Sequence, residues 1–205
     1  MKALGGLISK FEIRNSKFEL RRLPAAPLRL CSVSLPLVFL LALAWPVRAG
    51  TDPLRALMLQ APGESVEAPT FSLPDLTGRK IQLKDYRGRL VFLNFFATWC
   101  GPCREEMPGM ERLFRAYQDK GLAVLAIDMQ ESAKTVRPFV QELKLSFSSL
   151  LDTKGSVSHE YGIRALPGSF LVGRDGNILW RAMGGREWDA PEMLNYFGQA
   201  VAEKK

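Results

Sequence analysis

Histidine and cysteine are scarce in this chain of 205 residues, which contains one histidine and three cysteines. A tetrahedral zinc site takes four ligands, whereas only Cys100, Cys103 and His159 remain of these two residue types after Ala49. Covalent haem attachment needs a histidine directly after the second cysteine of a C-x-x-C pair, but Arg104 stands there. We therefore expect the protein to bind no metal and to need no cofactor.

Excess basic charge is also lacking outside the first 49 residues. The chain has 28 Lys+Arg against 21 Asp+Glu, but eight of the basic and two of the acidic residues precede Gly50, which leaves 20 against 19. A nucleic-acid-binding domain would concentrate basic residues in its folded part, so nucleic acid is not an expected partner. With 47% hydrophobic and 24% charged residues, the composition is that of a globular protein.

The basic N-terminal segment has the layout of a secretion signal. A basic stretch precedes the apolar run 34–47, and small residues follow that run. We expect residues 1–49 to be a signal peptide cleaved after Ala49 or, because the apolar run lengthens when counted from Leu28, a membrane anchor. Either arrangement places the following domain in the periplasm or another extracytoplasmic space.

Residues 66–203 are expected to form a single α/β domain, with a linker at residues 50–65. Nearly continuous apolar runs at 90–98 and 122–128 predict strands buried on both faces of a parallel sheet. Shorter alternating patterns predict an N-terminal β-hairpin at about 71–83 and an antiparallel strand pair, SFLVG and NILWRAM, joined by the turn at Asp175-Gly176.

Apolar residues at helical spacing predict the helices of this domain. The predicted helices lie at about 100–120, 135–143, 157–161 and 190–203. Thr135 is the expected N-cap of the second helix, with Pro138 in its first turn, where a missing N–H costs little. His159 is expected to be a solvated residue of the third helix. The order of strands and helices predicts a mixed sheet with helices on both faces.

Cys100 and Cys103 are expected to be a redox pair and not a structural bridge. A structural disulfide gains most by closing a long loop, and this one would enclose two residues. The pair follows a buried strand and begins a helix, whose free N–H groups and macrodipole favour the thiolate of Cys100. Cys103, about one turn later, can attack Cys100 in a mixed disulfide, and Pro102 suits the first turn.

At this point the chain resembles the thioredoxin fold, in particular the TlpA/ResA-like branch of extracytoplasmic thioredoxins, which includes the cytochrome c maturation reductases. The residues that carry the resemblance are WCGPC after LVFLNFFAT, Pro108, and ALPGSF before the strand pair. The resemblance covers about residues 66–203. It implies a thioredoxin-like mixed central sheet flanked by helices, disulfide-bearing protein substrates, and a membrane dithiol as electron donor.

The resemblance also implies the substrate-binding surface. Pro167 should be a cis-proline that faces the cysteines, which leaves the backbone of Leu166 free to pair with an incoming substrate strand. The other residues implied in this surface are Trp99, Gly101 and Pro102. The stretch PGSF departs from the PTTF common in the family, so the resemblance leaves the shape of the groove open.

Two polar positions near the cysteines distinguish this chain from cytosolic thioredoxins, in which a buried aspartate lies six residues before the first cysteine. Here that position is Asn94, whose amide can hydrogen-bond but cannot carry a proton, and we expect Asn94 and Pro108 to be structural residues beside the site. Glu106 matches the acidic residue of the ResA-like proteins. If buried, it should have a raised pKa and could act as general base for Cys103.

Glu106 also has a simpler interpretation, in which it and Glu105 are merely acids stabilised by the helix N-terminus. With Glu106 as a catalytic residue beside Cys100 and Cys103, the expected function is that of an extracytoplasmic thiol-disulfide oxidoreductase. Reduction of protein disulfides is favoured because the Gly-Pro pair between the cysteines resembles reducing thioredoxins. The alternatives are a disulfide oxidase of the same compartment and a non-catalytic thioredoxin-fold binding or chaperone module.

Overall fold

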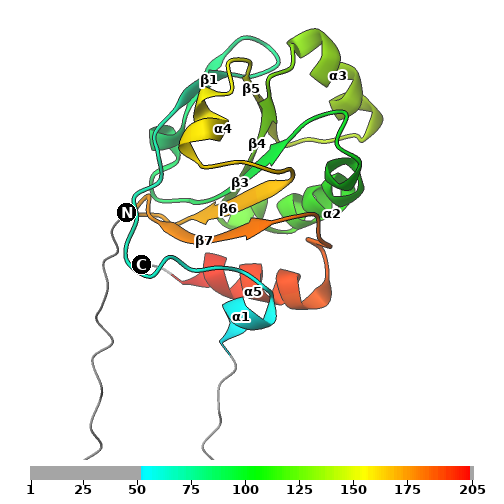
Figure 1. Cartoon of the computed structure of the whole chain (residues 1–205). Coiled ribbons are helices and arrows are strands. Elements are labelled where there is room, and N and C mark those ends of the chain that lie inside the picture. Colours follow the sequence, from blue (N-terminus) through cyan, green and yellow to red (C-terminus); the bar gives the residue numbers. More distant parts are fainter. Residues whose placement is uncertain (1–51, 204–205) are drawn as a thin grey trace, which may run out of the picture. The chain divides into compact units, whose positions relative to one another are not determined.

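The computed structural model describes residues 52–203, in which a five-stranded mixed sheet has helices on both faces (Figure 1). The strand order is β5–β4–β3–β6–β7; β3, β4 and β5 are parallel, and β6 is antiparallel to both β3 and β7. The strands are β3 (Leu90–Phe96), β4 (Leu122–Met129), β5 (Ser148–Asp152), β6 (Gly168–Val172) and β7 (Ile178–Met183). This confirms the expected thioredoxin-like arrangement.

A separate antiparallel hairpin, β1 (Ser72–Pro74) with β2 (Lys80–Gln82), precedes the sheet as predicted. The α-helices are α1 (Pro53–Ala56), α2 (Gly101–Tyr117), α3 (Ala133–Glu142), α4 (Ser156–Glu160) and α5 (Pro191–Ala202). Two short 3-10 helices lie at η1 (Leu83–Tyr86) and η2 (Gln118–Lys120). His159 is exposed on α4, as expected.

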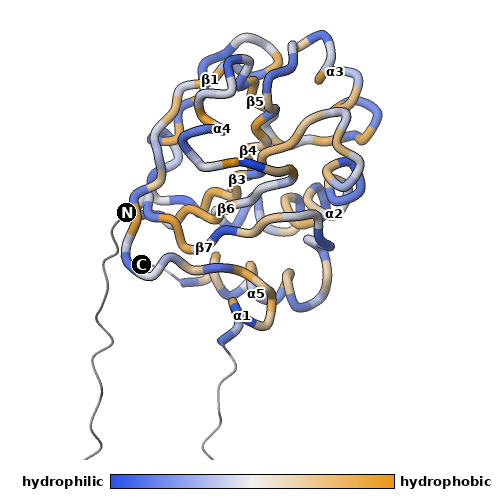
Figure 2. The backbone as a smooth tube through the Cα atoms, in the orientation of Figure 1, coloured by the Kyte–Doolittle hydropathy of each residue, from blue (hydrophilic) through white to orange (hydrophobic). Residues whose placement is uncertain are grey.

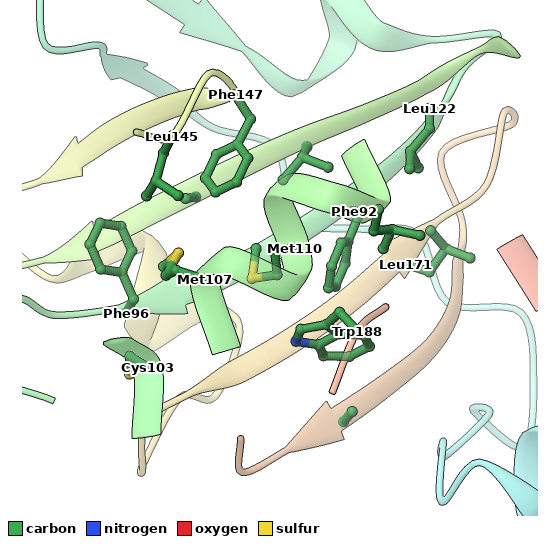
Figure 3. Close-up of a cluster of buried hydrophobic side chains, with 14 of the residues drawn as sticks. Phe92, Phe96, Cys103, Met107, Met110, Leu122, Leu145, Phe147, Leu171 and Trp188 are labelled. Atoms are coloured by element: carbon green, nitrogen blue, oxygen red, sulfur yellow. The ribbon is translucent and has the colours of Figure 1, made fainter. Parts of the chain in front are cut away.

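The central strand β3 is buried along its whole length, and its side chains alternate between two hydrophobic clusters. Phe92 and Phe96 face the cluster formed with α2, α3 and α5, while Leu93 and Phe95 face the cluster that contains the hairpin and α4. Figure 2 shows hydrophobic residues as orange stretches along the strands, and Figure 3 shows Met107 on the side of α2 that faces the sheet. This packing fixes the start of α2 at the end of the central strand.

The sequence pattern does not predict β5, which pairs with β4 at one edge of the sheet. Its sequence, SSLLD, has serines and an aspartate where a buried strand would carry apolar residues. Ser149 and Asp152 are nevertheless buried, and the Asp152 carboxylate accepts hydrogen bonds from the N–H and hydroxyl of Ser158. Because these contacts come from tertiary structure, local periodicity could not reveal the strand.

The predicted start of α3 is wrong by one turn. Ser132, and not Thr135, is the N-cap: its side chain accepts a hydrogen bond from the N–H of Thr135 at 3.4 Å. Since the helix begins at Ala133, Pro138 lies beyond the first turn, inside the helix. Its ring therefore leaves the carbonyl of Lys134 without the usual helical donor.

The expected leader, residues 1–49, and the question of its cleavage lie outside the described residues. Within residues 52–203, no helix has the length and apolar character needed to cross a bilayer. The described part of the segment 50–65, expected to be a linker, contains α1. In the same segment Leu59 is buried, and Gln60 forms a β-bridge with Arg181 of β7.

Candidate active site

The two cysteines lie where β3 leads into α2, and they form a disulfide with their Cα atoms 5.3 Å apart. Cys100 is the N-cap of α2, and its sulfur accepts a hydrogen bond from the backbone N–H of Cys103 at 3.2 Å. Cys100 is 6% exposed, whereas Cys103 is fully buried. A partner protein can therefore reach Cys100 first, while the helix N-terminus favours its thiolate.

The residues expected at the substrate surface come from two segments, residues 99–102 at the start of α2 and residues 166–167 directly before β6. Trp99 is 69% exposed, which is unusual for so large an apolar side chain. Gly101 and Pro102 are exposed in the first turn of α2. The Leu166–Pro167 peptide bond is cis, as expected, and both strand ladders of β6 end at Gly168. Leu166 thus lies outside the sheet, beside the strand that leads to the cysteines.

Gly168 stands where the PTTF pattern has its first threonine, and its surroundings leave little room for a side chain. A Cβ atom on this residue would lie 2.7 Å from Ile163 Cδ1 and 3.4 Å from Met183 Cε. Ile163 and Met183 therefore occupy the space that a threonine side chain would take in PTTF. Met183 is itself 43% exposed. The surface next to the cis-proline is consequently lined by apolar side chains.

Glu106 is a buried carboxyl group with three hydrogen-bond donors. Oε1 accepts from Asn94 Nδ2 at 2.8 Å, and Oε2 accepts from Trp188 Nε1 at 2.9 Å and from the backbone N–H of Arg186 at 3.3 Å. Burial raises the pKa of Glu106 to about 7, against the opposing effect of these donors and the Arg186 charge. Glu106 lies one turn after Cys103 on α2, and its pKa allows it to exchange protons at neutral pH. Glu105, in contrast, is exposed.

Asn94 lies on β3 at a position whose side chain points towards α2. Its amide nitrogen donates to Glu106 and also to the hydroxyl of Ser169 on β6, at 3.0 Å. Asn94 is fully buried, and its amide links β3, α2 and β6 beneath the disulfide. Pro108 lies inside α2, two residues after Glu106.

Four residues that the sequence does not point to contact the same region. Trp188 and Arg186 belong to the segment after β7 and reach Glu106 across 82 and 80 sequence positions. Glu131, after β4, accepts hydrogen bonds from the backbone N–H of Thr98 at 2.6 Å and from its hydroxyl at 2.7 Å. Asp128 accepts from the N–H of Glu131. For Trp188, Arg186 and Glu131 no local motif marks the contact, because the partners lie 33 to 82 positions away in sequence.

The Asp128 carboxyl group is fully buried near Glu131, and both its burial and that neighbour raise its pKa, to about 8. Glu131 in turn fixes Thr98, the residue before Trp99, so this acidic pair holds the loop that leads into the cysteines. Among residues 52–203, no three His, Cys, Asp or Glu side chains are arranged to hold a metal ion.

Comparison with known proteins finds similarity over most of this domain. Residues 65–181 match the model of the AhpC/TSA family. Thiol-disulfide oxidoreductase ResA of Bacillus thuringiensis subsp. konkukian is 43% identical over 118 residues, which cover 58% of this chain and 68% of that relative. Thioredoxin-like protein YneN of Bacillus subtilis is also 43% identical over 118 residues, covering 56% of this chain and 68% of that protein.

Solved structures show the same fold. A Chlorobium tepidum structure assigned to a thiol:disulfide interchange protein DsbE has a TM-score of 0.62 and 33% sequence identity, over 67% of this chain and 97% of that one. A thiol:disulfide interchange protein from Bacteroides sp. has a TM-score of 0.60 and 25% identity, over 69% of this chain and 91% of that one.

The raised pKa of Glu106 predicts a pH-dependent stability. Between the ordinary glutamate pKa and about 7, the folded protein keeps a proton that the unfolded chain has lost, so the free energy of unfolding falls as the pH rises. Glu106→Gln removes this dependence. The free energy of unfolding of the variant relative to the wild type should therefore increase by about 3 kcal/mol from pH 4.5 to pH 8.

This difference can be measured by urea unfolding of the oxidised proteins, in which the cysteines do not titrate. Glu105→Gln, at the neighbouring exposed position, is the control and should show no such increase. A constant difference between Glu106→Gln and the wild type over this pH range would mean that Glu106 ionises at the ordinary glutamate pKa.

Proposed function

The chain belongs to the AhpC/TSA family and is a thiol-disulfide oxidoreductase, and we propose that it works as a reductase of protein disulfides outside the cytoplasm. The observation that carries the proposal is the Cys100–Cys103 pair at the start of α2, one turn before a buried carboxyl group at Glu106. The Gly-Pro pair between the cysteines, which resembles that of reducing thioredoxins, supports the reducing direction.

In the proposed reaction, the Cys100 thiolate of the reduced protein attacks one sulfur of a substrate disulfide. This step forms a mixed disulfide and releases the first substrate thiolate, which takes up a proton. Cys103 then attacks the Cys100 sulfur, forming the Cys100–Cys103 disulfide and releasing the second substrate thiol. Two electrons pass from the protein to the substrate, and the pair must be reduced again before the next cycle.

Glu106 is proposed to act as general base in the second step. The thiol of Cys103 is fully buried, so solvent cannot readily remove its proton. A carboxylate with a pKa of about 7, one helical turn away, can accept that proton at neutral pH and leave the nucleophilic thiolate. Asn94 has only a positioning role in this scheme, because its amide donates to Glu106 and carries no exchangeable proton for the reaction.

The proposed substrate surface combines two segments. Trp99, Gly101 and Pro102 lie on the cysteine side, and Leu166 with cis-Pro167 lies on the other side. The backbone of Leu166, which lies outside the strand ladders, can pair with an extended substrate segment. The exposed apolar side chains of Trp99 and Met183 favour a substrate with apolar residues near its disulfide.

The partners and the compartment of the reaction are part of the proposal. We infer that residues 1–49 direct the domain to the periplasm or another extracytoplasmic space, as a cleaved signal or an anchor. A membrane dithiol would then supply the electrons. In an oxidising compartment a reductase is useful only towards particular disulfides, and the cysteine pair of apocytochrome c is an example of such a substrate.

Substitution of the cysteines tests the exchange reaction. Cys100→Ser should abolish the reduction of insulin disulfides, because the attacking thiolate is lost. Cys103→Ser should instead accumulate a mixed disulfide with the substrate, visible by mass spectrometry under non-reducing conditions, because the resolving thiol is lost. A Cys100→Ser protein that retains full cellular function would support the non-catalytic binding module.

The direction of the reaction is tested by the reduction potential of the Cys100–Cys103 pair. A reductase should have a potential near that of thioredoxin, about −270 mV, measured by equilibration with glutathione or dithiothreitol buffers. A value near about −120 mV, as found for strong disulfide oxidants, would refute the reductase and support the oxidase.

The base role of Glu106 predicts a pH-dependent loss of activity. Glu106→Gln should lower the rate of mixed-disulfide resolution about 100-fold at pH 7, because no group accepts the Cys103 proton. The deficit should shrink as the pH rises, because hydroxide can then remove the thiol proton in place of the carboxylate. Glu105→Gln is the matched control and should remain close to the wild type. Equal rates for the two variants at pH 7 would show that Glu106 is not the base.

A further inference from the structure

The segment after β7, residues 184–189 (the 184–189 loop), lies against α2 at two glycines. A Cβ atom on Gly185 would be 3.2 Å from the carbonyl oxygen of Pro102, between the cysteines. On α2, a Cβ atom on Gly109 would be 2.6 Å from Asp189 Oδ1 and 3.4 Å from the backbone nitrogen of Trp188. Glycine at both positions lets the loop approach the cysteine helix closely.

Trp188 is the residue of this loop that enters the core. Its side chain is fully buried, stacked on Trp180 with ring centroids 6.0 Å apart, and edge-on to Phe92 at 4.6 Å. Figure 3 shows Trp188 beside Phe92, on the sheet side of α2. Because the ring is fully buried against these two neighbours, its packing holds the indole N–H towards Glu106 Oε2, which lies 2.9 Å from Nε1.

Arg186 supports the same carboxylate oxygen. Its backbone N–H donates to Glu106 Oε2, while its guanidinium donates to the carbonyl of Leu57 at 3.0 Å and lies over the Trp188 ring. The 184–189 loop therefore brings two donors to one oxygen, and the third donor, Asn94, serves the other. All three groups are N–H donors to the carboxyl group and none accepts a hydrogen bond from it, so the ionised carboxylate satisfies them best.

The other charged groups near Glu106 lie in the cleft between α2 and the 184–189 loop. A cleft of about 310 Å³ between α2 and the loop reaches Glu106. The charged residues that line it, besides Glu106, are Glu105, Arg112, Arg186, Glu187 and Asp189. Arg112 pairs with Asp189 at 2.6 Å. On the sheet side, the polar neighbours Asn94 and Ser169 carry no charge, and on α2 itself the neighbour one turn earlier is Cys103.

We propose that Trp188 is a positioning residue for disulfide exchange: its buried indole N–H orients the Glu106 carboxylate and favours the ionised form that accepts the proton of Cys103. The proton passes from the Cys103 sulfur to a Glu106 oxygen, and Trp188 keeps its own N–H throughout. This inference rests on the proposed base role of Glu106. The position of the Glu106 midpoint tests Trp188, and the rate of resolution tests the base role.

The test compares two buried tryptophans of the same stack. Trp188→Phe removes the N–H that serves Glu106, whereas Trp180→Phe, the control, removes an N–H that donates to Tyr196 Oη at 3.0 Å. Titration of the Glu106 carboxyl carbon by NMR in the oxidised proteins should show the midpoint raised by about one pH unit in Trp188→Phe. Trp180→Phe should lie within about 0.3 unit of the wild type.

The activity follows from the same shift. At pH 6, Trp188→Phe should resolve the mixed disulfide about tenfold more slowly than Trp180→Phe, because about a tenth as much Glu106 is ionised. The two rates should converge above about pH 9. A loss of structure alone would lower the rate at every pH and leave the Glu106 midpoint in place.

Equal Glu106 midpoints in the two variants would overturn the role of Trp188. A raised midpoint with unchanged rates would instead uphold the positioning by Trp188 and refute Glu106 as the base. If Trp188→Phe does not fold, as judged by circular dichroism, β-(3-benzothienyl)alanine at position 188 keeps the bicyclic shape without the N–H. It should give the same shift of the midpoint, and an unshifted midpoint would overturn the proposal.

Discussion

The structure around the cysteines depends on how a single buried carboxyl group is held. Glu106 is 4% exposed, and removing a carboxylate from water is unfavourable unless other groups replace its hydration. Here the replacement comes from β3 through Asn94 and from the segment after β7 through Trp188 and Arg186. Asn94 lies only 12 positions from Glu106, but Trp188 and Arg186 lie 82 and 80 positions away, so the site exists only once the segment after β7 has packed against α2.

The sheet provides the rigid support for this assembly. Because β3 is the central strand and is buried on both faces, its alternation places Asn94 on the same side as Phe92 and Phe96. The aromatic cluster of Phe92, Trp180 and Trp188 then packs against Phe92's neighbour Phe197 of α5. The polar contacts under the disulfide are thus surrounded by closely packed aromatic rings, which exclude water and limit movement.

Much of this site can be predicted from the sequence, for a physical reason. A buried strand that runs into a helix, with cysteines three positions apart, involves only local patterns, so β3, α2 and the place of Cys100 follow from them. Glu106 follows from its spacing to Cys100 and the family resemblance. Strand β5 could not be predicted because it is stabilised by tertiary contacts and not by a local pattern. The N-cap of α3 is predicted wrongly because Ser132 and Thr135, two residues that can both cap a helix, lie only three positions apart. Trp188 could be foreseen only as a buried aromatic residue, because its partner lies 82 positions earlier.

The hydrogen bond from Arg186 to the carbonyl of Leu57 has a consequence for where the domain begins. Leu59 belongs to the same hydrophobic cluster as α2 and α5, and the partly buried Leu54 and Leu57 pack against that cluster. Gln60 pairs with Arg181 at the edge of the sheet. Residues 54–60, in the segment expected to be a linker, therefore pack against the domain that follows them. A shortened protein that begins at 66 would lack the acceptor for the arginine that steadies the donors to Glu106, and would expose the apolar surface that α1 covers.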